Sequence, residues 1–415
     1  MKLGTPGRKV KLGIIGLGCR GNEQLEVLLS MEDVEITMVC DVYADRVASY
    51  QDRIEKARGV RPAGTTDYHE VNASDNVEAV IIMTSWQTHV KIAIDAMEHG
   101  KIPGTEVGGA ASIDECWQLV RTCERTGVPL MFLENCCYND VEMALLRMIR
   151  EGIFGEVVHC RGGYQHDLRD EIGEGDINRH YRQDHFIARN GELYPTHELG
   201  PIASYLNLNR GNRMLTLVSM ASKAVGEHAW LAEHRPDNPG LQAARFNQGD
   251  VVTTMIRCAN GETIVLTHDC TLPRPYSRGG YVQGTKGVWE EEGHSIHLEG
   301  VTKPHRWESD KEQLAAHEHP LWKEYREFGL RGGHGGMDYL VLRAFIESIQ
   351  KQVPFPINVY DGASWMAVTC LSEQSIAMGS MPVPVPDFTD GAWIRREKRP
   401  GDMFSLDQIC FEAFE

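Results

Sequence analysis

The motif Gly16-Leu17-Gly18-Cys19-Arg20-Gly21 constrains the fold of this chain more than any other feature of the sequence. It follows an apolar run that ends at Ile15 and precedes a predicted helix over residues 22–31. In such a turn the first glycine allows a tight bend, the second lets the backbone approach a diphosphate, and the third lets the helix pack on the strand. The diphosphate lies against the helix N-terminus. The motif therefore predicts a turn that binds a dinucleotide.

A carboxylate follows the next predicted strand. Residues 34–40 form that strand, and Asp41 comes directly after it, roughly 20 residues beyond the last glycine of the motif, where an acid can accept both hydroxyls of an adenosine ribose. A carboxylate at this place repels a 2′-phosphate. We therefore expect NAD rather than NADP as the cofactor.

Strand and helix patterns alternate through the first third of the chain. Further strands are expected over residues 77–83, 101–106 and 128–134, with amphipathic helices between them. This alternation predicts parallel pairing with right-handed crossovers. We place an α/β domain with a Rossmann-type, doubly wound parallel sheet at residues 1–150.

The pattern becomes β-rich from about residue 153. Strand-like runs over 251–258 and 263–270 flank Asn260-Gly261, which is a strong hairpin signal. Other strands are expected over residues 214–221, 280–284 and 288–292, and helices over residues 338–350 and 363–378. An α+β domain with an open, largely antiparallel sheet is predicted over residues 151–381, and this sheet is a surface through which two copies could form a homodimer. Prolines alternating with valine predict that residues 382–415 form an extended C-terminal arm over the surface.

Composition excludes several classes of protein. The 415 residues carry a net charge of −17, which makes nucleic acid and anionic membranes poor partners. Eleven cysteines occur without a disulfide-like spacing or a C-x-x-C pair, so we predict reduced thiols and no metal site. No stretch is long and apolar enough to span a bilayer. We expect a soluble, cytoplasmic protein, unless an export signal has been removed from the chain.

Polar residues follow the predicted parallel strands, where ligands of such sheets bind. They occur in the opening turn and in the loops over residues 86–89, 104–109 and 134–138, which together predict a cofactor wall. For Thr88 and Asn135 a helix cap or a turn is an equal alternative.

His197 is the candidate acid or base in the second domain. It ends the segment Tyr194-Pro195-Thr196-His197 and is followed by Gly200-Pro201, a rigid backbone that would hold the imidazole in one orientation. A histidine titrates near neutral pH and can take and return a proton. A histidine that is hydrogen-bonded in a loop for structural reasons is the alternative. For Tyr276, packing is the simpler interpretation and a wall for a sugar is the second.

The chain resembles the Gfo/Idh/MocA family of oxidoreductase-like proteins and, over nearly its whole length, the NAD-dependent glycosidases of glycoside hydrolase family 109, whose best-known activity is α-N-acetylgalactosaminidase. Glu106-Val107-Gly108 stands where most dehydrogenases of the wider family have Glu-Lys-Pro, so the lysine that assists their proton transfer is missing. The most specific matches are Thr105-Glu106-Val107 with Gly109-Ala110, residues 162–169, residues 189–197, Leu199-Gly200-Pro201, residues 258–263 and residues 332–339.

The resemblance implies two sets of site residues. NAD would be bound by Gly16, Gly18, Cys19, Arg20, Asp41, Trp86, Gln87, Thr88, His89, Glu106, Val107 and Asn135. A glycoside substrate would be bound by Tyr164, Arg182, Tyr194, Pro195, Thr196, His197 and Tyr276. Two departures stand out: Glu198 replaces a common glycine, and the twin-arginine export signal frequent in that family is absent.

The resemblance also implies a mechanism in which NAD is borrowed and restored. C3 of the sugar is oxidised, C2 is deprotonated, the aglycone is eliminated, water adds, and C3 is reduced again. His197 would serve the C3 hydroxyl and Tyr164 the C2 proton, with the two roles open to exchange, and Glu134 and Glu198 are further acid or base candidates. The sugar, N-acetylgalactosamine or another hexose, and the anomer stay open. The rival functions are an NAD-dependent sugar dehydrogenase and a non-catalytic NAD-dependent sensor.

Overall fold

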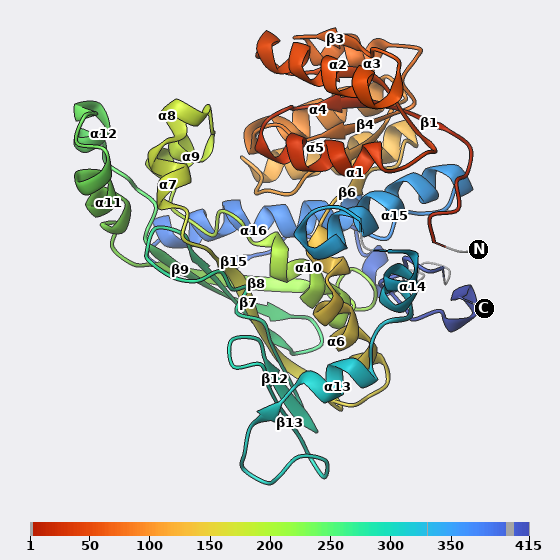
Figure 1. Cartoon of the computed structure of the whole chain (residues 1–415). Coiled ribbons are helices and arrows are strands. Elements are labelled where there is room, and N and C mark those ends of the chain that lie inside the picture. The colour runs from red at the N-terminus through yellow and green to blue at the C-terminus, as the bar shows by residue number, and fades with distance from the viewer. Residues whose placement is uncertain (1–2, 330, 396–401, 415) are drawn as a thin grey trace.

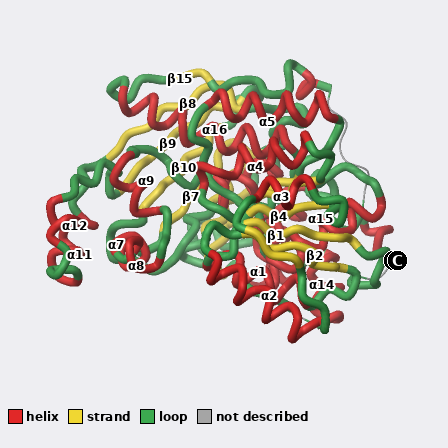
Figure 2. Tube along the Cα trace, turned by 90° about the horizontal axis from the view of Figure 1, so that it is seen from above, coloured by secondary structure: helices red, strands yellow, loops and turns green. Residues whose placement is uncertain are grey.

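The first part of the chain is a six-stranded parallel sheet with helices on both faces. The structure is a computed structural model, and it describes residues 3–329, 331–395 and 402–414 (Figure 1). In spatial order the strands are β3 (Ala63–Thr65), β2 (Val34–Cys40), β1 (Val10–Ile15), β4 (Ala79–Ile82), β5 (Ile102–Thr105) and β6 (Met131–Phe132). The helices are α1 (Cys19–Leu29), α2 (Ala44–Arg58), α3 (Tyr68–Ala73), α4 (Trp86–Glu98) and α5 (Ile113–Thr126). The predicted doubly wound sheet is confirmed, and Figure 2 shows its strands side by side.

A nine-stranded mixed sheet forms the second part. Its order is β14 (Glu308–Ser309), β13 (Ser295–Leu298), β12 (Gly287–Glu290), β11 (Tyr281–Gly284), β7 (Val157–Gln165), β10 (Thr263–Asp269), β9 (Val251–Cys258), β8 (Met214–Ala221) and β15 (Val383–Pro384). Among the described strands of this sheet, β7 and β10 pair in parallel and the other neighbours are antiparallel. The β9–β10 hairpin turns at the predicted Asn260-Gly261. The largely antiparallel sheet expected from the sequence is therefore present.

Two long helices join the sheets. α15 (Met337–Lys351) packs against α1 and β1, and α16 (Val359–Ala377) packs against α5 on one side and β8 on the other. Figure 1 shows both helices between the N-terminal unit and the second sheet. The contact between α16 and the loop after β5 is close, because a Cβ at Gly109 would come within 2.2 Å of Thr369 Oγ1.

The remaining helices that the structure describes are α6 (Asp140–Arg150), α7 (Arg169–Gly173), α8 (Gly175–Asn178), α9 (Arg182–Ala188), α10 (Thr196–Tyr205), α11 (Gly226–His234), α12 (Pro239–Ala243), α13 (Lys311–Ala316) and α14 (Pro320–Phe328). The 3-10 turns are η1 (Asn135–Tyr138), η2 (His334–Gly336), η3 (Ala392–Ile394) and η4 (Phe411–Phe414).

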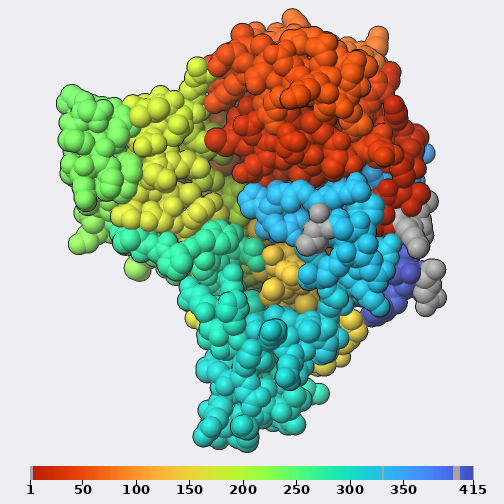
Figure 3. All heavy atoms as spheres, viewed as in Figure 1, coloured from red at the N-terminus to blue at the C-terminus, as the bar shows by residue number. Residues whose placement is uncertain are grey.

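The segment α7–α9 rises from the second part and reaches the N-terminal unit, as its yellow-green atoms in Figure 3 show. Arg179, between α8 and α9, donates to both oxygens of Asp45 at 3.1 Å. Its guanidinium also lies 4.4 Å from the ring centre of Tyr43, and Arg46 approaches the same ring at 4.8 Å. These contacts hold α7–α9 beside the loop that follows β2.

The end of the chain differs from its prediction. Residues 382–415 were expected as an arm over the surface, but Val383 and Pro384 form the edge strand β15 on β8. Val385, Phe388 and Phe404 are buried. Their apolar side chains gain more from burial than from exposure, so this segment is part of the core. Residues 396–401 and 415 of the predicted arm lie outside the described residues.

The domain boundaries at residues 150 and 381 and the homodimer stay predictions. Within the described ranges, no helix is both long enough and apolar enough to cross a membrane.

A buried ion pair fixes α15 to the N-terminal unit and generates a testable prediction. Arg343 donates to Asp33 at 2.7 and 2.8 Å, and both side chains are 2% exposed. Burial by itself would raise the pKa of Asp33, but the hydrogen bonds from Arg343 and Gln350 lower it to about 2. A lowered pKa stabilises the fold above the unfolded value of 3.8, and this stabilisation is lost as the pH falls through the folded value.

We expect Arg343→Met to reduce the free energy of unfolding at pH 7 by about 3 kcal/mol, because Asp33 would be left buried without its cation. The difference from the unchanged protein should shrink as the pH falls from about 4 to about 2. Urea unfolding at several pH values measures both effects. Arg326→Met removes an exposed pair with Glu318 and should cost less than about 1 kcal/mol. Equal losses in the two variants would contradict the prediction.

Candidate functional site

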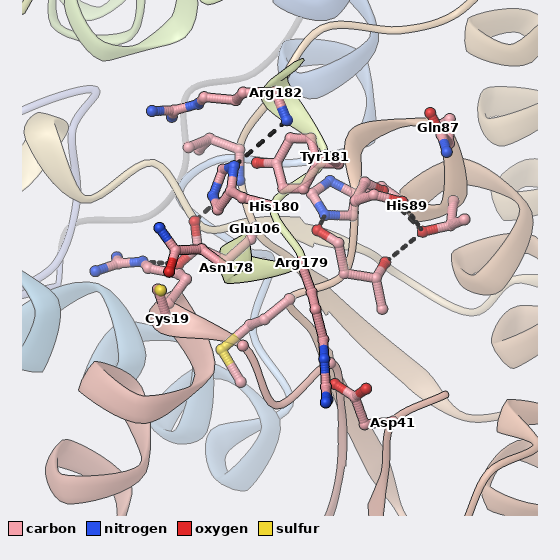
Figure 4. A pocket seen from close by; sticks show the side chains of 18 of the residues that line it. Cys19, Asp41, Gln87, His89, Glu106, Asn178, Arg179, His180, Tyr181 and Arg182 are labelled. Atoms are coloured by element: carbon pink, nitrogen blue, oxygen red, sulfur yellow. Dashed lines mark hydrogen bonds and ion pairs between the residues drawn. The ribbon is translucent and has the colours of Figure 1, made fainter. Parts of the chain in front are cut away.

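A pocket of about 860 Å³ opens at the carboxyl ends of the parallel strands. Its walls come from the loops after β1, β2, β4 and β5, from α7–α9, and from Tyr164, Tyr194 and His197 of the second part. Figure 4 shows part of it, with Asp41, Glu106 and Arg182 among the labelled side chains. The pocket therefore joins the predicted cofactor loops to the predicted substrate residues.

The opening turn is shaped for a diphosphate. Gly16 has φ +97°, and a Cβ there would lie 2.4 Å from the carbonyl oxygen of Met83, so only glycine fits. α1 begins at Cys19, and its N-cap residue Gly18 offers no side-chain hydrogen bond to the first turn. The N–H groups of that turn are therefore available to an anion at the positive end of the helix.

Asp41 is held rigidly at one end of the pocket. Its Oδ2 accepts from the Leu17 N–H at 2.8 Å and its Oδ1 from the Tyr43 N–H at 2.9 Å. Arg46 lies 3.6 Å from Oδ2. Each carboxylate oxygen has further lone pairs, so Asp41 can still accept from ribose hydroxyls. This arrangement fits the adenosine side of NAD.

An ion network centred on the buried Asp338 joins four residues of the pocket wall, Arg20, Glu106, Asn135 and His334. Arg20 donates from Nε to Glu106 at 2.7 Å and bidentately to Asp338 at 2.8 and 3.0 Å. Asp338 also accepts from Asn135 Nδ2 at 2.7 Å and bonds His334 Nδ1 at 2.8 Å. Burial opposes the ionisation of Asp338, but its bonds to His334 and Arg20 lower its pKa well below the usual range. The network ties three cofactor-binding candidates, Arg20, Glu106 and Asn135, to the start of α15.

Three rings and a guanidinium form the inner end of the pocket. The ring centres of Tyr164, Tyr194 and His197 lie 4.6 to 5.5 Å apart. Arg182 approaches the rings of both tyrosines at 5.7 and 5.3 Å and donates to Glu171 at 2.7 Å. Its Nε is buried without a hydrogen-bond partner among the described residues.

His197 is paired with a buried carboxylate. Its Nδ1 lies 2.8 Å from Glu134 Oε1, and Glu134 is fully buried at the end of β6. Burial alone would raise the pKa of Glu134, but the charge and hydrogen bond of His197 lower it below its ordinary value. The Glu134 carboxylate orients the His197 ring and leaves Nε2 for a ligand. A third group orients the base in the same way in enzymes with a catalytic histidine.

Most predicted site residues line the pocket and four do not. Among the loop residues, Gln87, Thr88, His89 and Val107 are part of the wall. The residues outside the lining are Trp86, Pro195, Thr196 and Tyr276. Trp86 is buried behind the lining, with its ring stacked on Tyr194 at 5.5 Å. Thr196 is fully buried, and Tyr276 is 48% exposed.

Two sequence interpretations of the second part are corrected. His197 is not in a loop, because Pro195 caps α10 and His197 occupies its first turn; proline is well suited to the start of a helix. Glu198 does not face the pocket. A Cβ at Gly162 would meet its Cγ at 1.6 Å, and its carboxylate lies 3.3 Å from Arg278.

Glu198 is therefore a buried structural group and not an acid or base for a ligand. Burial and the charge of Glu142 raise its pKa well above the usual range, although Arg278 opposes them. Arg278 also donates to Glu142 at 2.8 Å. One guanidinium thus serves two carboxylates.

Sequence reasoning missed several residues of this site. Asp338 and His334 belong to a motif that was noted in the sequence without a role, residues 332–339. Glu171, Arg179 and His166 also line the pocket or hold its wall. His166, His334 and Asp338 lie in motifs that the sequence shows, over residues 162–169 and 332–339. Arg179, in contrast, reaches Asp45 across 134 residues.

Comparisons with known proteins match both parts of the chain. The family described as "Glycosyl hydrolase 109, C-terminal domain" matches residues 138–395, and "Oxidoreductase family, NAD-binding Rossmann fold" matches residues 10–133. A glycosyl hydrolase family 109 protein of Stenotrophomonas maltophilia is 42% identical over 94% of this chain and 91% of its own. An α-N-acetylgalactosaminidase of Tannerella forsythia is 40% identical over 94% of this chain and 88% of its own.

The fold is also shared with dehydrogenases. A levoglucosan dehydrogenase solved with NADH and levoglucosan has a TM-score of 0.70 at 18% identity, and the match covers 91% of this chain and all of that chain. This likeness bears on the fold alone. With the family matches, the expected cofactor is confirmed: this chain binds NAD.

Gly16→Ala should weaken NAD binding, because a strained backbone at positive φ costs about 1–3 kcal/mol, which corresponds to about a fivefold to 150-fold rise in Kd if all of it is lost on binding. Calorimetric titration of NAD into protein stripped of cofactor measures the change. Gly59→Ala is the matched control, since Gly59 also has positive φ but has nothing within 4 Å of an added Cβ. An unchanged Kd for Gly16→Ala would contradict the assignment of this turn.

Proposed function

This chain belongs to glycosyl hydrolase family 109 and is a glycoside hydrolase that uses NAD, and we propose that it cleaves N-acetylgalactosaminides or related hexosaminides by oxidation at C3 followed by elimination of the aglycone. The name of the Tannerella forsythia relative supports this sugar. The observation that carries the proposal is that one pocket joins the dinucleotide turn to the Tyr164, Tyr194 and His197 cluster.

NAD would be held from the Asp41 end through the turn at Gly16 to Glu106 and Asn135, so that its reactive end lies toward His197. When bound there, it supplies an acceptor for the C3 hydride of the sugar and gives the hydride back at the end of the cycle. Arg20, which is held by Asp338, donates a hydrogen bond to the Glu106 carboxylate and fixes its position. The protein's part is to hold the sugar and move its protons.

His197 would take the proton of the C3 hydroxyl. Its Nδ1 is bonded to Glu134, which leaves Nε2 as the basic nitrogen toward a bound sugar. As the imidazole becomes positive, the buried carboxylate stabilises it. The base and its orienting acid are thus fixed before substrate binds.

Tyr164 would take the proton at C2, which becomes acidic once C3 is a ketone. It lines the pocket next to His197, with ring centres 5.5 Å apart. Arg182 is close enough for its charge to stabilise a phenolate. With two bases on one sugar, loss of the C2 proton and departure of the aglycone follow the oxidation.

The carboxylates near the inner end of the pocket support elimination of the aglycone rather than its displacement by a carboxylate or water. Glu134 is bonded to His197, Glu106 to Arg20 and Glu171 to Arg182. A glycosidase that works by displacement needs two carboxyl groups free to act on the anomeric centre. Acids that are each committed to a cation or an imidazole are poorly placed for that role.

The main rival is a sugar dehydrogenase. Val107 occupies the position where such enzymes have lysine, and Glu106 beside it is bonded to Arg20. A dehydrogenase would release one NADH for each substrate oxidised. A glycosidase of the proposed kind releases none.

The proposed function predicts deuterium at C2 of the released sugar when aryl N-acetylgalactosaminides are hydrolysed in deuterated water. It also predicts no net growth of absorbance at 340 nm during turnover, because the cofactor ends each cycle oxidised. Mass spectrometry and NMR of the product, with absorbance recorded in parallel, measure the two. Hydrolysis without deuterium at C2 would refute the elimination, and NADH formed in step with product would favour the dehydrogenase.

Glu134→Gln should lower kcat by about 10²–10⁴-fold, because His197 would lose the carboxylate that orients and stabilises it. NAD binding should persist, since Glu134 contacts His197 and not the dinucleotide turn. Steady-state kinetics and calorimetric titration of NAD separate the two effects. Glu151→Gln, which alters an exposed pair with Arg147, is the control. A Glu134→Gln variant with undiminished kcat would show that the pairing has no part in catalysis.

A further inference from the structure

Tyr164 carries its own proton, and that proton must leave before the phenol oxygen can take another. Burial raises the pKa of Tyr164 to about 12, and the charge of Arg182 offsets this only in part. A standing phenolate is therefore a minor form at neutral pH. A base at C2 built on this tyrosine needs a proton acceptor beside it.

His166 is in the position of such an acceptor. Its Nδ1 lies 3.1 Å from Tyr164 Oη, and its side chain lines the pocket. Tyr164 lies in β7 and His166 directly follows the last residue of that strand, where its N–H donates to the carbonyl of Asp269 at 2.9 Å. Tyr276 packs edge-on against the His166 ring with centres 5.0 Å apart. The ring is thus held against the phenol from two sides.

The charges around His166 favour a neutral ring that can be protonated during the reaction. Burial and the charge of Arg182 lower its pKa, while Glu171, Asp167 and Asp170 oppose them. Among the described residues, none is hydrogen-bonded to its Nε2, and the ring is half-buried. A proton taken up at Nδ1 can therefore be matched by one released from Nε2 to solvent.

We propose that His166 accepts the phenolic proton of Tyr164 while Tyr164 removes the C2 proton of the oxidised sugar, so that the two side chains form a proton relay. The proposal rests on the C3 oxidation and elimination argued above. His166 acts through Tyr164 and does not need to touch the sugar.

The step balances. The C2–H bond breaks and its electron pair forms the C1–C2 double bond, while the bond from C1 to the aglycone oxygen breaks and that oxygen keeps the pair. The C2 proton goes to Tyr164 Oη, and the original phenolic proton goes to His166 Nδ1. His166 is then positively charged and the aglycone oxygen negatively charged. Release of a proton from His166 Nε2 neutralises the imidazole, and uptake of a proton neutralises the aglycone oxygen. When water adds at C1, the relay runs in reverse and returns a proton to C2.

Two substitutions separate proton acceptance from hydrogen bonding. His166→Asn keeps an acceptor oxygen near the position of Nδ1 but cannot be protonated, and His166→Gln changes the reach of that oxygen. His159→Gln is the matched control, because His159 lies in β7, the strand that His166 follows, and bonds Thr263 outside the pocket lining. Bound NAD and circular dichroism report whether each variant is folded.

The experiment follows two reactions of the NAD-loaded protein with an aryl N-acetylgalactosaminide in deuterated water. C3 oxidation is read as the transient rise at 340 nm in a single turnover, and C2 deprotonation as deuterium at C2. We expect both His166 variants to lose about 100-fold in C2 exchange while C3 oxidation stays within about threefold. A third variant, His166→Ala, leaves space for a free imidazole beside Tyr164. Added imidazole should restore part of the C2 exchange in this variant.

Two results would overturn the relay. Exchange at the unaltered rate in His166→Asn would show that a hydrogen bond suffices, and an equal fall of both reactions would show a structural role only. If the unaltered protein itself gives no deuterium at C2, the proposed function fails and the relay fails with it. Exchange in the unaltered protein with none lost in the variants would overturn the relay alone.

Discussion

The bidentate bond from Arg20 to Asp338 is the contact on which the rest of the site depends. Arg20 comes from the dinucleotide turn and Asp338 from the first turn of α15, 318 residues later, and Glu106 and Asn135 join the same network. A buried charge is costly unless it is paired and hydrogen-bonded. The network is stable only when the turn, the end of β5, η1 and α15 are all in place. It therefore couples the shape of the cofactor pocket to the packing of the second part of the chain.

The sequence predicted the regular elements well where burial is periodic. The strands expected over residues 34–40, 214–221 and 251–258 have the bounds of β2, β8 and β9, because their alternating or continuous apolar residues leave one register that buries them. It failed where contacts are distant. The burial of Phe388 and Phe404 depends on partners that no local pattern reveals. The same holds for the site, since Glu134 and His197 lie 63 residues apart and Arg179 reaches Asp45 across 134.

Glu198 is a charged side chain that is buried outside the pocket lining. Its burial needs room for the carboxylate and a cation to meet it. Gly162 supplies the room, because any side chain there would collide with Glu198, and Arg278 supplies the charge. Arg278 is also bonded to Glu142, whose other oxygen bonds the hydroxyl of Tyr205. Glu198 thus belongs to a buried cluster with Arg278, Glu142 and Tyr205 that lies outside the pocket lining.

The two proposed bases have the same construction. In each, a group that faces the sugar is hydrogen-bonded to a second group farther from it: His197 to Glu134, and Tyr164 to His166. The partners differ because the tasks differ. A carboxylate suits an imidazole that becomes positive and must stay oriented, whereas a phenol that gives up its proton needs a partner that can carry that proton away. Glu134 is fully buried and cannot exchange protons with water, while His166 is half-buried and can. In the proposed mechanism, the C2 proton would therefore exchange with solvent through His166.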